Sequence, residues 1–231
     1  MKALGKIAIV IMGPPGSGKG TQANLLANRF GLVHFDTGSY LDKILNNPTL
    51  LKKNAEMRKE RHYWNTGMLN TPSWVLDIVK NKVKKINHAG LSVVFSGSPR
   101  TFYEGFGDKK NEGLMKFLEK EYGRKNIFIF KINVLASSSI KRNSARMLCS
   151  ICGTQILGNL MKTKLTFCPF CGGKLKTRTL DKPKIIKERL KEYEERTQPM
   201  IKELKKRKYR ITEINGAPLP FKIHEKIIEF L

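Results

Sequence analysis

The stretch that decides the fold is Lys6-Ile-Ala-Ile-Val-Ile-Met12, followed by Gly13-Pro-Pro-Gly-Ser-Gly-Lys-Gly-Thr21. The short run rich in Ile and Val is typical of a strand that is buried on both faces. The glycines after it allow the chain to turn tightly, so that successive N–H groups and the start of the next helix bind phosphate oxygens. Lys19 adds a mobile positive charge that can follow a phosphoryl group. The strand, the helix and the lysine in register together predict a phosphate-binding loop rather than an ordinary glycine-rich turn.

Length and composition favour one globular core. A chain of 231 residues, of which 40% are hydrophobic, can bury one sizeable core and still carry inserted flaps. The first apolar run has about seven residues, which is too few for a membrane span, and its context is wrong for a signal peptide. We therefore expect a cytoplasmic protein without a membrane partner.

The charge of the chain is strongly positive, with 44 Lys and Arg against 19 Asp and Glu, a net charge of +25. Such a charge directs attention to anionic partners, namely nucleotides, RNA or an acidic membrane surface. The lysines are spread along the chain without a stripe of interleaved aromatic residues. This pattern favours a solvated basic surface over a specific nucleic-acid site, and it leaves RNA binding open as the less favoured reading.

Alternating strand and helix patterns predict an α/β fold with a parallel sheet covered on both faces. We expect strands within residues 6–12, 31–38, 90–95, 126–133 and 209–214, and helices at 21–30, 39–45, 71–86, 183–197 and 221–231. Residues 49–64 are largely polar and basic, and at best their spacing is that of a helix. Thr71 is expected to cap the third of these helices, with Pro72 in its first position, and Pro199 to open a separate helical segment.

All four cysteines lie in one segment, as Cys149-Ser-Ile-Cys152 and Cys168-Pro-Phe-Cys171, with fifteen residues between the pairs. This is the spacing of a structural zinc site with four thiolate ligands, which leaves no open position for chemistry. Two disulfides or four free thiols are the alternatives, and a cytoplasmic chain disfavours the disulfides. The segment has few apolar residues, so we expect it to unfold without its metal.

Taken together, these motifs resemble those of adenylate kinases of the long-lid, zinc-binding type, along nearly the whole chain. The matching marks are Gly13–Ala23, Asp36-Thr-Gly38, Gly97-Ser-Pro-Arg-Thr101, the two cysteine pairs, and Thr177-Arg178 followed by Arg189. The resemblance implies a P-loop core (residues 1–38, 71–146 and 180–231) with two mobile parts. One is a helical flap over the nucleoside monophosphate (residues 39–70), and the other is a zinc-bearing lid over ATP (residues 147–179).

The resemblance also implies a role for each site residue in phosphoryl transfer from ATP, with Mg²⁺, to AMP. The residues that it assigns to ATP are Gly13, Gly16, Ser17, Gly18, Lys19, Gly20, Thr21, Arg142 and Arg146. Those that it assigns to the monophosphate are Thr37, Gly38, Arg100, Glu104, Arg178 and Arg189. Lys19, Arg100, Arg146, Arg178 and Arg189 would be catalytic, because the transition state needs positive charge around its oxygens. The resemblance also implies a monomer.

Several positions depart from the family's usual pattern. Ser96 stands where an aspartate orients the water shell of magnesium, and Gly20 leaves the position after Lys19 without a hydroxyl. Ser98 replaces a phenylalanine, Asp42 replaces an arginine for the acceptor phosphate, and Leu180 replaces an aspartate at the lid hinge. Two alternatives to an adenylate kinase therefore stay open, a kinase for GMP, CMP or UMP and a nucleotide- or RNA-binding homologue with weakened catalysis.

Glu104 stands where the family carries a glutamine that reads the adenine edge. A carboxylate only accepts hydrogen bonds, whereas an amide both donates and accepts. We therefore hypothesise that the acceptor preference is relaxed or moved toward GMP, unless the loop is shifted so that Glu104 faces solvent. The histidines His34, His62, His88 and His224 show no metal-ligand spacing and receive no role.

Overall fold

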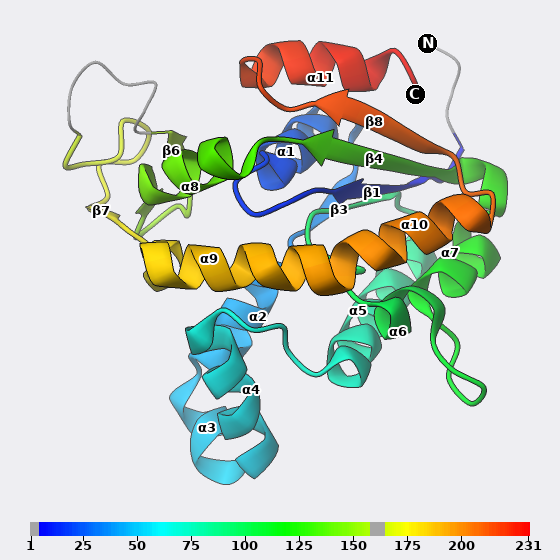
Figure 1. The fold of residues 1–231 in the computed structure, drawn as a ribbon, viewed down its shortest axis with the longest axis horizontal. Coiled ribbons are helices and arrows are strands. Elements are labelled where there is room, and N and C mark those ends of the chain that lie inside the picture. Colours follow the sequence, from blue (N-terminus) through cyan, green and yellow to red (C-terminus); the bar gives the residue numbers. More distant parts are fainter. Residues whose placement is uncertain (1–4, 158–164) are drawn as a thin grey trace.

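The computed structural model describes residues 5–157 and 165–231, and a five-stranded parallel sheet forms its centre (Figure 1). The strand order is β2-β3-β1-β4-β8, with β1 between β3 and β4. The strands are β1 (Ala8–Met12), β2 (Val33–Phe35), β3 (Val93–Phe95), β4 (Ile127–Asn133) and β8 (Ile211–Asn215). The parallel sheet predicted from the sequence is confirmed, because each crossover between neighbouring strands contains at least one helix.

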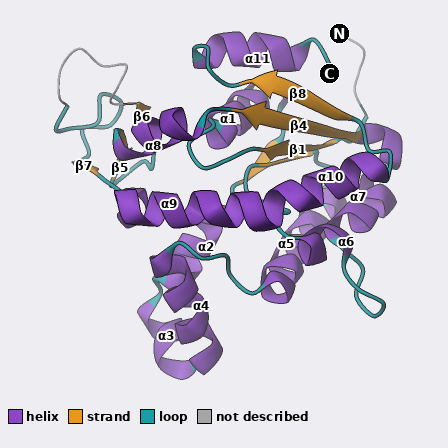
Figure 2. Ribbon diagram, viewed as in Figure 1, coloured by secondary structure: helices purple, strands orange, loops and turns teal. Residues whose placement is uncertain are grey.

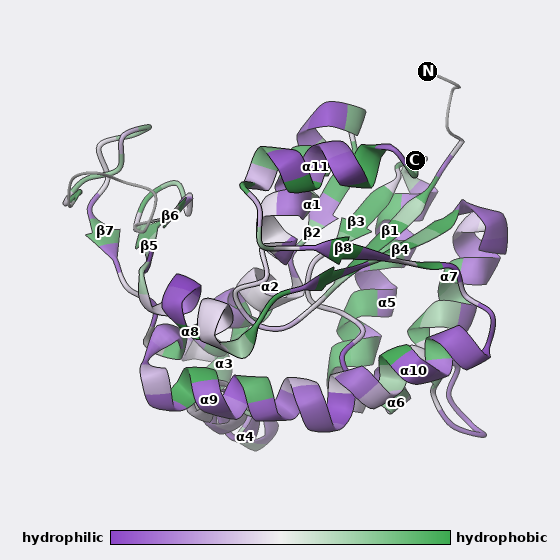
Figure 3. Cartoon of the chain, turned by 45° about the horizontal axis from the view of Figure 1, so that its top comes forward, coloured by the Kyte–Doolittle hydropathy of each residue, from purple (hydrophilic) through white to green (hydrophobic). Residues whose placement is uncertain are grey.

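Helices cover both faces of this sheet (Figure 2), and each face has its own hydrophobic core. Successive residues of β1 point to opposite faces. Val10 therefore packs with α5 (Pro72–His88) and α7 (Leu114–Tyr122), whereas Ile9 packs with α1 (Lys19–Phe30) and α11 (Pro220–Ile228). Figure 3 shows the central strands as hydrophobic, in agreement with burial on both sides.

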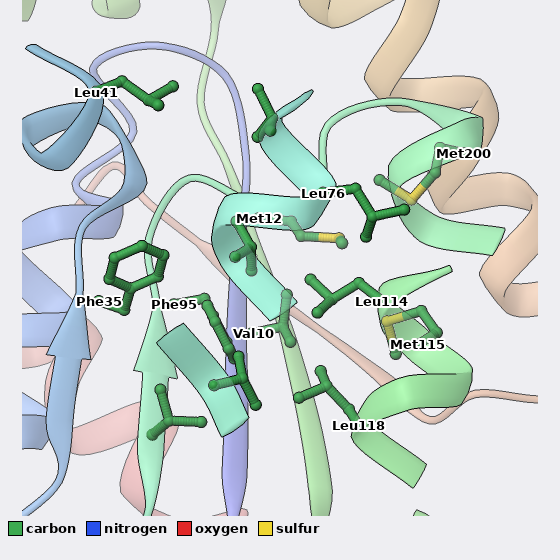
Figure 4. Close-up of a cluster of buried hydrophobic side chains, with 14 of the residues drawn as sticks. Val10, Met12, Phe35, Leu41, Leu76, Phe95, Leu114, Met115, Leu118 and Met200 are labelled. Carbon is green, nitrogen blue, oxygen red and sulfur yellow. The ribbon is translucent and has the colours of Figure 1, made fainter. Parts of the chain in front are cut away.

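The larger core lies behind the phosphate-binding loop, between the sheet and α5, α7 and α10 (Gln198–Lys206) (Figure 4). Phe95 from β3 and Leu118 from α7 are fully buried in it, together with Met200 from α10. Burying a large apolar side chain stabilises a fold by about 1.5–3 kcal/mol. This packed layer therefore fixes the carboxyl ends of β1 and β3.

The segment expected to be mostly polar, residues 49–64, forms two short helices. They are α3 (Pro48–Lys53) and α4 (Ala55–Thr66), which together with α2 (Thr37–Leu45) project from the sheet layer (Figure 1). Asn47 and Asn54 cap the two helices with side-chain oxygens that accept backbone N–H groups. Leu51, Met57 and Trp64 are buried and supply the apolar contacts of this projection.

The predicted start of α5 is confirmed in position, because Thr71 is the N-cap residue and Pro72 opens the helix. The Thr71 hydroxyl does not cap the helix, however; it donates to the buried carboxylate of Glu60, which also accepts from Asn70 Nδ2 at 2.9 Å. The segment opened by Pro199 is not separate, because α9 (Pro183–Glu192), a π-helical turn (Tyr193–Thr197) and α10 form one continuous rod. Proline has no N–H, and a wider π turn before it accommodates the missing hydrogen bond.

The cysteine-bearing segment folds as a small three-stranded antiparallel sheet. Its strands are β5 (Arg146–Cys149), β6 (Gln155–Leu157) and β7 (Leu175–Lys176), with β5 in the middle. The helix α8 (Ala136–Ser144) leads into it, and the turn η3 (Thr179–Asp181) leads back to α9. Within the described residues, no helix combines the length and the apolar character that crossing a membrane requires.

Candidate functional site

A cavity opens at the carboxyl ends of β1 and β3, and residues from the parallel sheet layer, from α2 and from the small antiparallel sheet line it. The lining includes the loop after β1, the start of α2, the segment after β3, and arginines from α8, β5 and α9. In open parallel sheets ligands bind in the crevice outside the carboxyl ends of the strands. The predicted phosphate-binding loop therefore lies where a ligand is expected.

The loop from Gly13 to Gly18 is held tightly against α8. A Cβ on Gly16, whose φ is +74°, would lie 2.4 Å from Asn143 Nδ2 and 2.9 Å from the Ser139 carbonyl oxygen. The Ser139 hydroxyl also donates to the carbonyl of Pro15. Ser17 is fully buried, and its hydroxyl has no hydrogen-bond partner among the described residues. The loop is thus pre-shaped, with α1 starting at Lys19 directly behind it.

Lys19 folds back over this loop. Its ammonium group donates to the carbonyl oxygens of Gly13 and Pro14, both at 2.8 Å. Burial lowers the pKa of Lys19 well below its ordinary value, and the positive charges of Arg100, Arg189 and Arg146 lower it further. The carboxylate of Asp36 acts in the opposite direction. A cation held in such surroundings is stabilised when an anion enters.

Arg146, Arg189 and Arg178 lie near one buried carboxylate, that of Asp181 in the turn η3. Arg146 donates to it twice, from Nε at 2.9 Å and from Nη2 at 2.5 Å, and Arg189 Nη1 donates to it at 3.4 Å. Burial lowers the pKa of Arg189 to about 9, and the charges of Arg146, Arg100 and Arg178 add to this effect. Arg178 also has a lowered pKa, mainly through burial and then through Arg146. One carboxylate thus compensates only part of the positive charge.

A second candidate anion site lies at the N-terminus of α2. Asp36 caps this helix by accepting from Ser39 N at 3.1 Å, and Thr37 and Gly38 form its first turn. A Cβ on Gly97 would lie 3.3 Å from Arg100 Nη2, 3.3 Å from Thr37 Cβ and 3.6 Å from Gly38 N. The guanidinium therefore faces a helix N-terminus, where backbone N–H groups favour negative charge. The Thr37 hydroxyl is buried and without a partner in the described part of the chain.

Glu104 is buried in the wall of the same cavity, with 3% of its surface exposed. The alternative in which it faces solvent is therefore wrong. Its Oε2 accepts from Arg100 N at 3.1 Å, and its Oε1 accepts from the Thr101 hydroxyl at 3.2 Å. Burial raises the pKa of Glu104, and the Arg100 amide opposes that shift.

Three positions that depart from the family's usual pattern, Ser96, Asp42 and Leu180, have hydrogen-bond partners within the chain. Ser96 Oγ lies 2.6 Å from His34 Nε2, and His34 Nδ1 lies 2.6 Å from Asn24 Oδ1. Asp42 does not line the cavity, although its charge opposes the lowering of the Arg178 pKa. Its carboxylate accepts from the indole N–H of Trp64 at 3.0 Å, which ties α2 to α4. Leu180 is buried, and its carbonyl oxygen accepts from Arg189 Nη1 at 3.1 Å.

Arg142 lies at the other end of the cavity. Its guanidinium donates to the carbonyl oxygens of Gly216 at 2.8 Å and Ala217 at 3.0 Å. It thereby fixes the segment 216–220, of which residues 217–220 line the cavity. From the lid side, Gln155 approaches the loop, since its Nε2 lies 3.9 Å from a Cβ built on Gly20.

The four cysteines come together, and none of them forms a disulfide. Their sulfur atoms all lie within 4.8 Å of one another, with Cys149 and Cys171 3.4 Å apart and Cys152 and Cys168 3.7 Å apart. Tetrahedral coordination with metal–sulfur bonds of about 2.3 Å separates the sulfurs by about 3.8 Å. The backbone N–H groups of Ile151 and Cys152 point to Cys149 Sγ at 3.4 and 3.5 Å. The arrangement could hold one four-coordinate metal ion.

The structure brings the sequence-predicted residues to one cavity, apart from the cysteine cluster in the lid. Sequence reasoning missed Asp181, and it gave no role to His34. It also missed Ser139 and Asn143, which support the loop from below. The sequence carried a weak signal for Asp181 alone, an acid three residues after Arg178 at the lid hinge.

Comparisons of the sequence with known proteins all indicate one family. The family model described as adenylate kinase matches residues 11–209. An adenylate kinase of Methanothrix thermoacetophila is 36% identical over 225 residues, which cover 96% of this chain and 97% of the relative. An adenylate kinase of Caldicellulosiruptor saccharolyticus is 33% identical over 207 residues, 89% of this chain and 90% of the relative. An adenylate kinase of Chlamydia pneumoniae is 34% identical over 192 residues, which cover 83% of this chain and 82% of the relative.

Proposed function

Because the chain belongs to the adenylate kinase family, we propose that it transfers the terminal phosphoryl group of ATP to AMP and yields two ADP. The observation that carries this proposal is the concentration of positive charge in the cavity. Lys19 has its pKa lowered by burial and by three arginines, and Asp181 balances only part of that charge. Two bound nucleotides would supply the missing negative charge.

On the donor side, the loop residues Gly13, Gly16, Ser17, Gly18, Gly20 and Thr21 bind the phosphates of ATP through their backbone. Lys19 exchanges its bonds to the Gly13 and Pro14 carbonyl oxygens for bonds to phosphate oxygens. Arg142 and the segment 216–220 that it fixes would form the wall against the ATP base. We expect the terminal phosphate of ATP to lie next to the α2 N-terminus and Arg100.

On the acceptor side, Thr37, Gly38 and Arg100 hold the monophosphate. The N-terminus of α2 and the Arg100 guanidinium both favour an anion there, and a guanidinium binds phosphate with two parallel hydrogen bonds. Arg100 Nε is itself held by the Gly97 carbonyl oxygen at 2.7 Å. The acceptor phosphate is therefore oriented by a preformed group rather than by a freely moving side chain.

In the transfer step, an oxygen of the acceptor phosphate forms a bond to the terminal phosphorus of ATP. The bond from that phosphorus to the bridging oxygen breaks, and the first ADP leaves with the electron pair. Arg146, Arg178 and Arg189 line the same cavity, and we infer that they stabilise the charge on the transferred group. For this role Arg146 shares or exchanges its bonds to Asp181.

The residues present fit a magnesium ion that enters with ATP. Magnesium usually keeps several waters and is held by one or two carboxylates together with substrate phosphates. Asp36 lines the cavity and acts on the charge of Lys19, and the Ser17 hydroxyl is buried without a partner in the described part of the chain. Asp36, with Ser17 and Ser96, would hold the metal-bound waters. The ion itself would neutralise charge on the phosphates.

We further propose that the four cysteines hold a structural zinc ion, in support of a lid at residues 147–179. The lid and the flap at residues 39–70 would close over the core formed by residues 1–38, 71–146 and 180–231. Closure would exclude water, so that the phosphoryl group reaches AMP and not solvent. Thiolate ligands require a reducing compartment, which supports a cytoplasmic location.

The experiment that tests this function compares Lys19→Ala with Lys184→Ala, an exposed lysine on α9. ADP formation from ATP and AMP is followed in a coupled assay at defined magnesium concentration. We expect Lys19→Ala to lower kcat at least about a hundredfold, the scale for removing one electrostatic stabiliser of a transition state. Lys184→Ala should keep the wild-type rate. Undiminished turnover in Lys19→Ala would contradict the proposal.

A further inference from the structure

One buried carboxylate in the cavity wall has no part in binding phosphates. Glu104, on α6 (Phe102–Phe106), is 3% exposed and lies four residues after the phosphate-binding Arg100. We propose that Glu104 reads the base of the acceptor, and that this subsite takes GMP, a purine whose edge donates two hydrogen bonds, alongside AMP. The proposal rests on the proposed function, and it names the second acceptor of that same site.

The carboxylate of Glu104 is fixed from behind. Oε2 accepts one hydrogen bond from Arg100 N, and Oε1 accepts one from the Thr101 hydroxyl, which in turn accepts from Glu104 N at 3.1 Å. An ionised carboxylate has about four acceptor positions, two on each oxygen. Among the described residues, one acceptor position on each oxygen therefore stays unused, and the bonds to Arg100 N and Thr101 hold the carboxylate in the cavity wall.

Two adjacent acceptor positions match one purine better than the other. Guanine presents the N1–H and the 2-amino group next to each other, and both are donors. Adenine presents its 6-amino group as a donor and N1 as an acceptor, so one of its two atoms would face a carboxylate oxygen without a proton between them. Two N–H groups against one carboxylate form a charge-assisted, bidentate pair, the stronger class of hydrogen bond.

A second observation also indicates a polar ligand at this end of the cavity. Ser98 is 3% exposed, and its hydroxyl has no hydrogen-bond partner among the described residues. It lines the same cavity, two residues before Arg100. A buried hydroxyl without a partner is costly, and a hydroxyl can donate to the O6 or N7 acceptors that guanine carries. Leu41 and Val75 supply apolar walls to the cavity.

The same carboxyl group accounts for AMP when it carries a proton. The neutral acid has one O–H donor and one carbonyl acceptor, the pattern that pairs with adenine. Burial raises the pKa of Glu104; the Arg100 amide hydrogen bond, the charge of Arg100, the Thr101 hydroxyl and the charge of Arg196 oppose this shift. Arg196 is itself paired with Glu192 at 3.4 Å. The preference for GMP over AMP should therefore rise with pH, as Glu104 ionises.

The test measures kcat/KM for AMP, GMP, IMP and CMP at saturating Mg·ATP, in the wild type and in Glu104→Gln. The amide restores one donor and one acceptor, so we expect the GMP:AMP ratio to fall at least about tenfold, the value of one charge-assisted hydrogen bond. IMP lacks the 2-amino group and should fall below GMP in the wild type. Glu194→Gln, an exposed glutamate on the π-helical turn, is the matched control and should leave the ratio unchanged.

The pH profile separates base reading from a merely structural role. In the wild type the GMP:AMP ratio should rise with pH, and in Glu104→Gln it should be flat. A glutamate that only caps α6 would change both acceptors together and leave the ratio independent of pH. Should Glu104→Gln fail to fold, the wild-type order of GMP and IMP and the wild-type pH profile decide the question alone.

AMP transfer without detectable GMP transfer would overturn this inference and leave the proposed function intact. A GMP:AMP ratio that is equal in the wild type and Glu104→Gln would overturn it in the same way. Absence of transfer to every monophosphate would overturn the proposed function, and the inference with it.

Discussion

The substitution Asp181→Asn probes the charge balance of the lid hinge. Asp181 is 6% exposed, and its carboxylate accepts two hydrogen bonds from Arg146 and one from Arg189. Both arginines are mostly buried, with side-chain exposures of 12% and 18%. Asparagine keeps the shape of the side chain but removes its charge. The variant therefore leaves two buried guanidinium groups without their counter-ion.

Breaking a buried ion pair by removing one partner costs about 3–5 kcal/mol. Asparagine still offers one acceptor oxygen, so we expect the lower end, about 3 kcal/mol. For a chain of this size 1 kcal/mol corresponds to roughly 2–4 °C in Tm, which gives a decrease of about 6–12 °C. Phosphate oxygens can replace the lost carboxylate, so saturating ATP should raise the Tm of Asp181→Asn more than that of the wild type.

Thermal unfolding followed by circular dichroism, with and without ATP, measures both quantities. Asp77→Asn makes the same charge change at an exposed position of α5 and should shift the stability by no more than about 0.5 kcal/mol. The reasoning is refuted if Asp181→Asn melts within the error of Asp77→Asn. It is also refuted if ATP stabilises the variant less than the wild type, since Asp181 would then not be what compensates the arginines.

Two further predictions concern the metal cluster and an exposed carboxylate. A strong chelator should remove one zinc ion per chain and make the lid sensitive to protease, while the β-sheet signal of the core in circular dichroism stays unchanged. Cys149→Ser should have the same effects. Metal analysis that finds no zinc in protein purified under reducing conditions would contradict this prediction. Hydrogen bonds from Lys205 and Asn133 lower the pKa of Glu213 to about 2. The ionised carboxylate therefore contributes its full stabilisation of the folded state above pH 4.5, and this stabilisation is lost as the pH falls toward 2. Glu213→Gln should therefore lower the free energy of unfolding near neutral pH by at most about 1 kcal/mol, because the Lys205–Glu213 pair is largely exposed. In acid-unfolding curves, the variant should lose less stability between pH 4.5 and 2 than the wild type. An equal loss of stability in this pH range would show that Glu213 contributes nothing.

The features predicted from the sequence are those whose physical cause is local. The phosphate-binding loop lies between its own strand and helix, and the two cysteine pairs each sit in one tight turn, so spacing alone identifies both. The parallel sheet follows from the alternation of strands and helices. The resemblance implied a helical flap at residues 39–70, but the bounds of its two helices within residues 48–66 were not predicted, because few apolar residues mark them. Their caps, Asn47 and Asn54, were nonetheless readable signals.

The features that were missed depend on residues brought together by the tertiary fold. Asp181 contacts Arg146 only because the lid returns to the core beside its own starting point, 35 residues later. His34 reaches Ser96 because β2 and β3 are neighbours in the sheet, a pairing that no local pattern specifies. Burial of Glu104 likewise depends on packing around α6, which the sequence did not place.

The central claim is that the cavity transfers phosphoryl groups between nucleotides and excludes water. Phosphorus-31 NMR of a mixture of ATP, AMP and magnesium with the protein measures this directly. The account predicts that two ADP appear for each ATP consumed, that the reaction reverses when ADP alone is supplied, and that inorganic phosphate does not accumulate. ATP loss with release of inorganic phosphate, or no change in any nucleotide signal, would contradict it.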